Sequence, residues 1–371
     1  MKFFILTFGC QMNTSDSQKI AALLQGQGHR PIKAASSAQA LKKADIIVLN
    51  ACSVRQSAID RVYGKINNLP DKKIIVAGCL SDFDKKRMAV RQNVSFWHPD
   101  DYFDLPPLYT SKLTAYVPIM TGCNNFCSYC VVPFTRGREK SRPTKDIIAE
   151  IKLLTKNGVK EIVLIGQNVN SYKSRLISSS PHLREELRWD VNKKTPPSPS
   201  PSLTEEGRRD KVINFAKLLK TINALPGDFR ISFLTSHPKD ISDELITTMA
   251  KCGKLVKEIH LPVQSGDNQV LKKMNRHYTV VRYKNLIKKI RQKIPGVKIS
   301  TDIIIGFPGE TKRQFANTVK LAKSIKFNKA FIAKYSPRQG TAAAKLKDDV
   351  SATEKTRRWR VLDTLINKFE H

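Results

Sequence analysis

The sequence predicts an α/β protein with two parts: an N-terminal Rossmann-like domain and, after it, a partial (β/α)6 TIM barrel. Short apolar runs alternate with helical patterns along most of the chain, which is typical of parallel α/β folds. A Pro- and Asp-rich segment at residues 99–113 separates three such runs from six later ones. The 371 residues also suit two domains better than one.

The expected Rossmann-like domain covers residues 1–98. Apolar runs at Phe3–Phe8, Ile46–Leu49 and Ile74–Ala77 predict buried parallel strands, with helices at Ser15–Leu24 and Ser57–Ile66 between them. Each strand is followed closely by one cysteine: Cys10, Cys52 and Cys79. Because the carboxyl ends of parallel strands share one edge of the sheet, these three thiols could converge there.

The expected barrel covers residues 114–345, after a linker at residues 99–113. Its predicted strands are Tyr116–Ile119, Glu161–Ile165, Phe229–Phe233, Glu258–Leu261, Lys298–Ile305 and Lys329–Tyr335. Its predicted helices include Thr144–Asn157, Val212–Ile222 and Val281–Ile294. In barrels of this kind the chemistry is carried by the C-terminal ends of the strands.

Two segments stand apart from this alternation. Residues 173–211 contain the Pro- and Ser-rich run Thr195–Ser202 between charge clusters, which predicts a disordered or loop-like insertion; a functional lid is the alternative. Residues 346–371 form a C-terminal tail, in which Thr353–Phe369 is expected to be a basic helix.

Composition excludes several classes of protein. No run of 18 apolar residues occurs, so no membrane span is expected. The apolar start, Met1–Cys10, is short and lacks a small-residue cleavage site, so we interpret it as a buried strand and expect the protein in the cytoplasm. Seven cysteines, an odd number, argue against a disulfide framework.

The chain is strongly basic. Lys and Arg total 65 against 32 Asp and Glu, a formal net charge of +33. Such an excess attracts polyanions through counterion release. The alternative is a lysine-rich composition with a solvated basic surface, because lysines occur in every region. Charge therefore indicates a nucleic-acid partner without naming it.

The most informative motif is CxxxCxxC, formed by Cys123, Cys127 and Cys130. Three thiolates on one loop can hold three irons of a 4Fe-4S cube and leave the fourth iron without a protein ligand. A small molecule can bind that iron, and S-adenosylmethionine (SAM) is suited to chelate it through its amino and carboxylate groups. The alternative, a zinc knuckle, needs a fourth Cys or His, and none follows Cys130 closely.

This motif resembles that of the radical SAM superfamily. The wider run Thr121–Pro143 is similar to the methylthiotransferase family, in particular its tRNA-modifying, MiaB-type branch. Further matching runs are Gly9–Asn13, Asn50–Arg55, Ile165–Asn170, Thr235–Pro238, His260–Gly266, Met274–Arg276, Ser300–Glu310 and Tyr335–Arg338. The resemblance covers residues 1–345 apart from the insertion. Family members usually continue into an RNA-binding TRAM domain, which we expect to be absent because the chain ends at His371.

The resemblance implies two 4Fe-4S clusters and SAM as cofactors. Cys10, Cys52 and Cys79 match the three cysteines that hold the family's auxiliary cluster, whose free iron is thought to carry the sulfur to be inserted. The alternative is that they are buried packing thiols. Cys252 matches no family motif, and for it packing is the expectation.

The resemblance also implies roles for other residues. Tyr129 would lie near the adenine of SAM. The expected SAM contacts at or near strand ends are Asn168, Asn170, Ser236, Gln264 and Asp302. The expected substrate contacts are Arg136, Arg138, Arg142 and His237, with a solvated loop as the alternative for the arginines. Gly306, Pro308 and Gly309 would shape a turn, and no catalytic residue is expected beyond the clusters and SAM.

The implied reaction adds a methylthio group to C2 of the isopentenyladenosine beside the anticodon of tRNA. One SAM would methylate sulfur on the auxiliary cluster and a second would supply a radical, with the electron from flavodoxin or ferredoxin. Two relatives act instead on threonylcarbamoyl-adenosine in tRNA or on a ribosomal-protein aspartate. An alternative from a different functional class is that the chain is a non-catalytic RNA-binding protein with structural metal sites.

Overall fold

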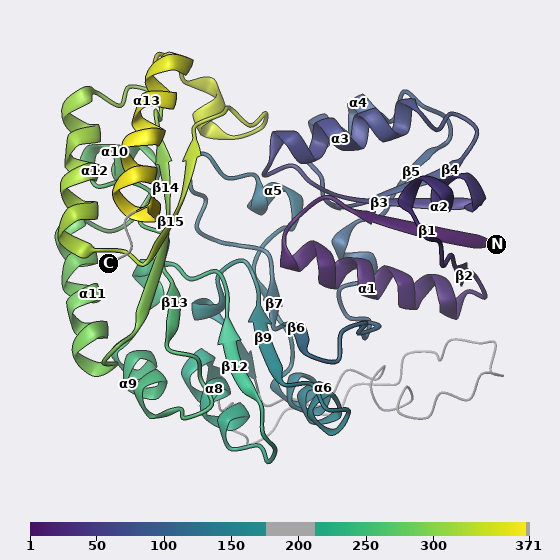
Figure 1. Ribbon diagram of the computed structural model, residues 1–371, viewed down its shortest axis with the longest axis horizontal. Coiled ribbons are helices and arrows are strands. Elements are labelled where there is room, and N and C mark those ends of the chain that lie inside the picture. The colour runs from purple at the N-terminus through teal and green to yellow at the C-terminus, as the bar shows by residue number, and fades with distance from the viewer. Residues whose placement is uncertain (176–211, 369–371) are drawn as a thin grey trace, which may run out of the picture.

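The computed structural model describes residues 1–175 and 212–368. Two α/β lobes lie side by side, with the short helix α5 (Val132–Thr135) between them (Figure 1). The N-terminal lobe contains a five-stranded parallel sheet in the order β2-β1-β3-β4-β5. Its strands are β1 (Lys2–Thr7), β2 (Arg30–Pro31), β3 (Ile46–Cys52), β4 (Lys73–Cys79) and β5 (Val94–Phe96). The expected Rossmann-like fold is confirmed.

Alternation along β3 explains how this sheet is covered on both faces. Ile47 and Leu49 pack in one cluster with α3 (Gln56–Asn67), whereas Ile46 and Val48 pack in another with α1 (Gln11–Gly26). Successive side chains of a strand point to opposite faces, so an apolar run without polar breaks is buried from both sides. The shorter helices α2 (Ser37–Lys43) and α4 (Asp82–Met88) complete the lobe.

The segment expected to be a linker packs against the N-terminal sheet. After the 3-10 turn η1 (Pro99–Asp101), Tyr102 and Phe103 are both only 1% exposed. The Tyr102 hydroxyl accepts a hydrogen bond from the backbone N–H of Gly78 at 3.1 Å. The Lys19 ammonium donates to the carbonyl of Phe103. The two buried aromatic rings thus hold residues 102–103 against the sheet.

The second lobe is an open parallel barrel of six strands. They are β6 (Thr114–Pro118), β9 (Glu161–Ile165), β12 (Arg230–Phe233), β13 (Glu258–His260), β14 (Lys298–Ile305) and β15 (Lys329–Lys334). Backbone pairing gives two parallel halves, β6-β9-β12 and β13-β14-β15. A parallel bridge between Ile231 and Leu255 joins the halves, leaving β6 and β15 at the two ends. The expected partial (β/α)6 barrel is confirmed.

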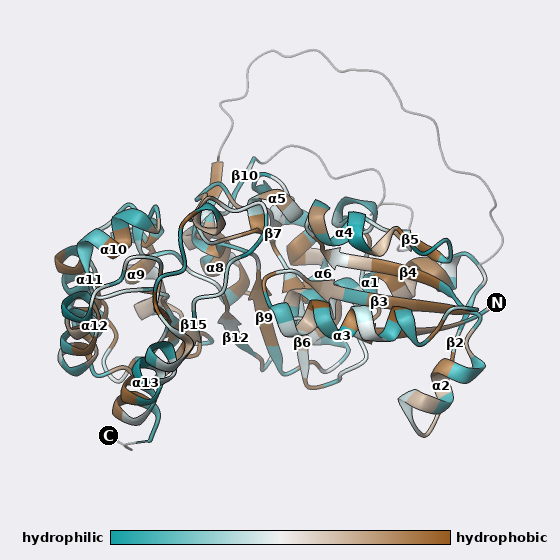
Figure 2. Ribbon diagram, turned by 90° about the horizontal axis from the view of Figure 1, so that it is seen from above, coloured by the Kyte–Doolittle hydropathy of each residue, from teal (hydrophilic) through white to brown (hydrophobic). Residues whose placement is uncertain are grey.

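Helices cover the outside of the barrel. They are α6 (Thr144–Lys156), α8 (Phe215–Asn223), α9 (Asp243–Lys251), α10 (Asn268–Lys273), α11 (Val280–Lys293) and α12 (Lys312–Ile325). Figure 2 shows hydrophobic colour along strands such as β9 and alternating hydrophilic and hydrophobic colour along the outer helices α11 and α12. One continuous cluster of buried apolar side chains fills the space between strands and helices.

The expected helix Val212–Ile222 was wrong at its start. Val212–Asn214 is strand β11, which pairs antiparallel with β10 (Lys173–Arg175). Asn214 then caps α8, because its side-chain oxygen accepts from the backbone N–H of Lys217 at 2.9 Å. The expected insertion therefore begins as a strand at Lys173, and its residues 176–211 lie outside the described part of the chain.

The C-terminal tail covers the free edge of β15. Helix α13 (Ala352–Asp363) continues into a π-helical turn, η5 (Thr364–Lys368). Asn367 pairs with the backbone of Ala330, accepting at 3.0 Å and donating at 2.9 Å, as a neighbouring strand would. The Trp359 indole donates to the carbonyl of Ile332 at 3.1 Å. These bonds satisfy part of an otherwise unpaired sheet edge.

Within the described ranges 1–175 and 212–368, none of the helices has the length and apolar character needed to cross a membrane.

Candidate functional site: two cysteine triplets facing one domain junction

The first cysteine triplet lies at the C-terminal edge of the N-terminal sheet. Cys52 and Cys79 are the last residues of β3 and β4 and are register partners, and Cys10 is the N-cap residue of α1. Cys52 and Cys79 lie opposite each other on adjacent strands, and each thiol shifts the pKa of the other, so that the pKa of Cys52 is lowered and that of Cys79 is raised. Burial and then Cys79 raise the pKa of Cys10. Three thiols distant in sequence therefore meet.

Two glycines permit this approach. Gly78, before Cys79, has φ +95°, and a Cβ there would lie 2.4 Å from the carbonyl oxygen of Ala51. Gly9, before Cys10, would place a Cβ 2.2 Å from Oδ1 of Asn13. Only glycine accepts such contacts and, at Gly78, that backbone angle without strain. The glycine before Cys10 and the glycine before Cys79 thus allow the close approach of the chain at the sheet edge.

A buried amide pair fixes the same edge. Asn13 donates from Nδ2 to Oδ1 of Asn50 at 2.8 Å and to the carbonyl of Ala51 at 3.0 Å. Its Oδ1 accepts from the backbone N–H of Cys10 at 3.2 Å. Asn50 in turn donates to the carbonyl of Asn13 at 2.7 Å. Buried amides need such partners, so this pair ties the start of α1 to β3 beside the thiols.

The second triplet lies on the loop between β7 (Met120–Thr121) and α5. The backbone N–H of Cys123 donates to the carbonyl of Gly137 at 3.1 Å. Arg276 donates to the Sγ of Cys127 at 3.4 Å. Burial first, and then the charges of the neighbouring Cys127 and Cys123 thiolates, raise the pKa of Cys130 to about 12. The three thiols of the loop are close enough to influence one another.

Neither triplet surrounds a position for a single ion. Among residues 1–175 and 212–368, no three His, Cys, Asp or Glu side chains are grouped in a way that could hold one metal ion. A 4Fe-4S cube presents a different requirement, because each of its three thiolates binds a different iron. All seven cysteines are free thiols, and Cys252 is buried in the barrel core, as expected for a packing residue.

Four predicted SAM contacts carry buried polar atoms that have no hydrogen-bond partner among residues 1–175 and 212–368. They are Oδ1 of Asn168, Nδ2 of Asn170, Oγ of Ser236 and Oε1 of Gln264. All follow the C-terminal ends of β9, β12 or β13. Leaving such an atom unsatisfied costs about 1–3 kcal/mol, so a group of them at one end of a barrel is typical of a ligand site.

The two asparagines are held in place by their remaining amide atoms. Asn168 donates from Nδ2 to Asp240 at 2.7 Å, and Oδ1 of Asn170 accepts from the backbone N–H of His237 at 3.1 Å. One amide atom of each residue is therefore fixed by the protein, and the other is available. The available atoms are an acceptor on Asn168 and a donor on Asn170, which suits the ammonium and carboxylate of an amino acid.

Backbone strain occurs at the same strand ends. Thr235 and Gln264 have φ of +70° and +69°, in a region that a β-branched residue such as Thr rarely adopts. The Thr235 hydroxyl donates to the carbonyl of Gly166 at 2.6 Å, which helps to hold this conformation. Strained residues of this kind cluster at ligand sites, where the surrounding structure imposes them. Thr235, which has this conformation, directly precedes Ser236, one of the four residues with an unpartnered polar atom.

Other predicted contacts have protein partners. Asp302 lies 3.2 Å from Nε2 of His260. His237 is 4% exposed, its ring packs edge-on against Tyr278, and burial followed by Arg276 lowers its pKa to about 2. Burial raises the pKa of Tyr129, a residue of the cysteine loop that packs in a cluster with Met274, Phe307 and Tyr335. Tyr129 therefore packs near the turn after β14, while His237 is a buried residue.

The three arginines after the loop differ in placement. Arg136 is 2% exposed and is bonded to Asp16 and to Cys79 of the N-terminal lobe. Arg142 is 6% exposed and forms an ion pair with Glu150 at 2.7 Å. Arg138 is exposed and lies 4.3 Å over the ring of Phe126. Of this run, Arg138 is the arginine accessible to an anionic partner.

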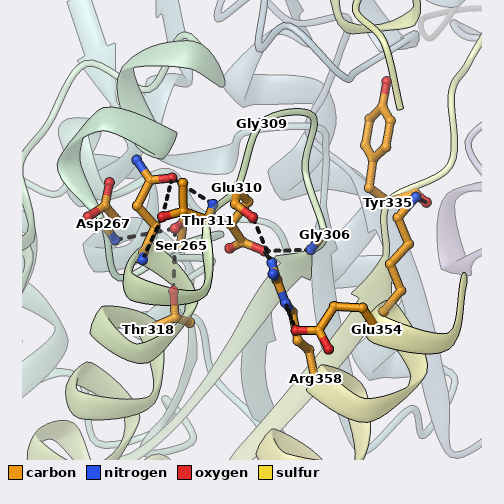
Figure 3. A network of polar contacts seen from close by, with 12 residues as sticks. Ser265, Asp267, Gly306, Gly309, Glu310, Thr311, Thr318, Tyr335, Glu354 and Arg358 are labelled. Atoms are coloured by element: carbon orange, nitrogen blue, oxygen red, sulfur yellow. Dashed lines mark hydrogen bonds and ion pairs between the residues drawn. The ribbon is translucent and has the colours of Figure 1, made fainter. Parts of the chain in front are cut away.

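The loop Gly306–Glu310 forms the expected turn, with φ of +66° at Gly306 and +73° at Gly309. Figure 3 shows the Glu310 carboxylate between the backbone N–H of Gly306 and the guanidinium of Arg358, both at 2.6 Å. A Cβ on Gly306 would lie 2.4 Å from the side chain of Lys355. Helix α13 therefore fixes a loop at the C-terminal end of β14.

Sequence reasoning missed several residues of this site. Arg276 and Asn13 stand inside runs that support the family resemblance, but nothing in the sequence indicates what they contact. Arg338 crosses between the lobes and donates to the carbonyl of Val54 at 3.0 Å and to Gln56 at 2.9 Å. Such contacts depend on how the two lobes dock, which strand and helix patterns do not reveal.

Comparison with known proteins agrees with this geometry. The family model "Radical SAM superfamily" matches residues 117–322, and "Uncharacterized protein family UPF0004" matches residues 2–98. The chain is 39% identical to the tRNA-2-methylthio-N(6)-dimethylallyladenosine synthase of Clostridium novyi, covering 99% of this chain and 81% of that protein. The same enzyme of Syntrophomonas wolfei is 38% identical, covering 96% and 80%.

A solved structure has the same fold. The radical S-adenosylmethionine methyltransferase TsrM from Kitasatospora setae, with cobalamin and a [4Fe-4S] cluster bound, superposes with a TM-score of 0.57. The match covers 92% of this chain and 77% of that one, at 11% identity. At that identity the likeness concerns the fold alone.

Proposed function

The chain belongs to the radical SAM superfamily and, within it, to the family of tRNA-2-methylthio-N(6)-dimethylallyladenosine synthases, and we propose on this premise that it adds a methylthio group to C2 of isopentenyladenosine in tRNA. It is a transferase whose family implies SAM and a 4Fe-4S cluster. The observation that carries the proposal is the group of polar atoms without a partner among the described residues at the C-terminal strand ends of the barrel, whose cysteine loop is linked through Arg136 to Cys79 of the other triplet.

The residues of the barrel fit SAM and the 4Fe-4S cluster that binds it. Cys123, Cys127 and Cys130 would hold three irons, and the unpartnered atoms of Asn168 and Asn170 would bind the amino-acid part of SAM. When bound, this pair of cofactors supplies a 5′-deoxyadenosyl radical. The protein contributes orientation, since Asp240 and the backbone of His237 fix the two asparagines. Ser236 and Gln264 have further unpartnered atoms for the same ligand.

The N-terminal lobe fits a second, auxiliary 4Fe-4S cluster. Cys10, Cys52 and Cys79 supply three soft thiolate ligands, the donor type that iron–sulfur clusters use. Three ligands leave one iron free for the sulfur that is transferred. The register pairing of Cys52 with Cys79, and the bonds by which Asn13 joins Cys10 to Ala51, support a shared ligand at this sheet edge.

The remaining partners follow from charge and family. With a net charge of +33, the protein would bind the phosphates of tRNA, and the exposed Arg138 and Lys140 lie beside the first cluster loop. The target base would have to leave the stacked anticodon loop to reach the cofactors. We assign the electron supply to flavodoxin or ferredoxin and the protein to the cytoplasm.

Nucleoside analysis tests this function. Anaerobically reconstituted protein, with dithionite, SAM and tRNA carrying isopentenyladenosine, is expected to cleave SAM and to yield the 2-methylthio nucleoside on mass spectrometry. A Cys123→Ala variant serves as the control without the radical cluster. SAM cleavage without a methylthio product on this tRNA would contradict the proposed substrate, and absence of SAM cleavage would contradict the enzyme class.

A further inference from the structure

Arg136 joins the two cysteine triplets across the junction between the lobes. It belongs to the barrel lobe, directly after α5, but its side chain reaches into the N-terminal lobe. Its Nε donates to the Sγ of Cys79 at 2.8 Å, and its Nη2 donates to the carboxylate of Asp16 in α1. The side chains of Arg136 and Asp16 are 1% and 2% exposed. The ion pair is therefore fully buried at the sheet edge that carries the first triplet.

The third nitrogen of this guanidinium has no partner. Nη1 of Arg136 is buried and makes no hydrogen bond within the described structure. A guanidinium has five N–H donors in a fixed plane, so two bonded nitrogens determine where the third one points. A buried charged donor without an acceptor destabilises the protein unless a bound ligand supplies that acceptor. An anionic group beside Cys79 would be such a ligand.

A short path leads from Arg136 to the other triplet. The carbonyl of Gly137, the next residue, accepts from the backbone N–H of Cys123 at 3.1 Å. The short helix α5 (Val132–Thr135) lies between Cys130 and Arg136. One residue thus contacts a thiol of the N-terminal lobe while its neighbours are bonded to the cysteine loop of the barrel.

We propose that Arg136 is a positioning residue for the auxiliary cluster: it donates from Nε to the Cys79 thiolate and from Nη1 to an anionic sulfur atom of the cluster or of its exchangeable ligand. This inference rests on the proposed function. Hydrogen bonds to cluster sulfurs stabilise the added negative charge of the reduced state and raise the reduction potential. Charge-assisted bonds from arginine are stronger than neutral ones.

The same contact fixes the position of the auxiliary cluster relative to the cluster held by Cys123, Cys127 and Cys130. Because Arg136 is rigidly linked to the Cys123 loop, the Nε contact sets where Cys79 sits with respect to that loop. Arg338 also crosses the junction, but it bonds to the carbonyl of Val54 and to Gln56 and to no cysteine. Arg338 therefore provides a matched control, because it docks the lobes without touching a ligand of the cluster.

The first test asks whether Arg136 contacts the auxiliary cluster, in a protein whose Cys10, Cys52 and Cys79 are unaltered. In a Cys123→Ala/Cys127→Ala/Cys130→Ala background only the auxiliary cluster remains, at about four irons per chain. Arginine labelled with 15N in the guanidinium is incorporated, and the reduced cluster is measured by pulsed electron paramagnetic resonance. A 15N coupling is expected, and it should persist in the Arg338→Gln variant and disappear in Arg136→Lys. Absence of the coupling in the protein that keeps Arg136 would overturn the inference.

The second test is a redox titration of the same cluster. Asp16→Asn/Arg136→Met removes donor and counter-charge together, so no unpaired charge is left in the interior. At the midpoint potential of the parent, the reduced-to-oxidised ratio should fall about tenfold, a shift of about 59 mV to lower potential. An Arg338→Lys variant, which keeps the positive charge near Cys52, should keep the parent potential. Equal potentials in all three proteins would refute the role of Arg136, whereas a parent that binds no iron would refute the proposed function itself.

Discussion

At the scale of single residues, glycine decides whether the auxiliary thiols can meet. The backbone of β4 passes so close to β3 and α1 that a side chain at Gly78 has no room between Ala51 and Asn13. The N–H of Gly78 is also bonded to Tyr102, a residue of the segment between the lobes. The position of Cys79 therefore depends on a residue that carries no chemistry of its own.

We predict that Gly78→Ala prevents loading of the auxiliary cluster. The new methyl group would lie 2.4 Å from the carbonyl oxygen of Ala51 and would push Cys79 away from Cys52. Reconstituted iron should fall from about eight to about four atoms per chain, because the cysteine loop of the barrel is untouched. Gly28→Ala is the control, since Gly28 also has a positive φ, +84°, but open space around it. An unchanged iron content in Gly78→Ala would contradict this account.

The cysteines could be identified from sequence, whereas the residues that support them could not. CxxxCxxC is a local spacing, and Cys10, Cys52 and Cys79 each follow an apolar run, so both triplets could be predicted. Arg136 appeared to be one of several basic residues after the loop. Its partners Asp16 and Cys79 lie 120 and 57 positions away. Only the docking of the two lobes shows why this arginine is buried.

At the scale of elements, helix α13 does more than end the barrel. Arg358 and Glu310 form an ion pair with side chains 3% and 1% exposed, and Glu310 also accepts from the backbone of Gly306 (Figure 3). Removing one partner of a buried ion pair leaves the other partner as an uncompensated charge in the interior. The helix thereby holds the loop that follows β14 at the ligand end of the barrel.

We predict that Arg358→Met lowers the stability of the protein by about 3–5 kcal/mol, the usual cost of leaving a buried charge without its partner. Thermal or urea unfolding of the anaerobic protein measures this change. Arg357→Gln is the matched control, because Arg357 neighbours Arg358 and bonds to the same Glu354 but lies at the surface. Its effect should be small. Equal stability of the Arg358 and Arg357 variants would contradict the role assigned to the buried pair.

Long periodic elements followed from the sequence, and short ones did not. The predicted strands Glu161–Ile165 and Lys298–Ile305 coincide with β9 and β14. The edge strands β2 and β5 were not predicted, since they have only two and three residues. Val212–Asn214 was assigned to a helix because its apolar residues continue the pattern of α8, whereas pairing with β10 makes it a strand.

At the scale of the whole molecule, charge and lobe docking determine what the protein can bind. The net charge of +33 is spread over both lobes, and Arg136 and Arg338 fasten the lobes at the auxiliary triplet. Composition revealed the charge directly. The docking was not deducible from it, because the crossing contacts join residues up to 284 positions apart.

We predict that binding of tRNA weakens steeply with salt. Each neutralised phosphate releases counterions, so the logarithm of affinity should fall linearly with the logarithm of salt concentration. If about six phosphates are contacted, affinity should drop roughly a thousandfold between about 50 and 200 mM salt. Filter binding at several salt concentrations measures the slope. Affinity that does not change with salt would contradict a phosphate-based contact.

The central claim is that each cysteine triplet holds its own 4Fe-4S cluster, and iron counting by Mössbauer spectroscopy on three proteins tests it most directly. The parent should contain about eight irons per chain in 4Fe-4S form. The Cys10→Ala/Cys52→Ala/Cys79→Ala variant and the Cys123→Ala/Cys127→Ala/Cys130→Ala variant should each contain about four. A parent with about four irons, or a first variant that loses none, would contradict the account.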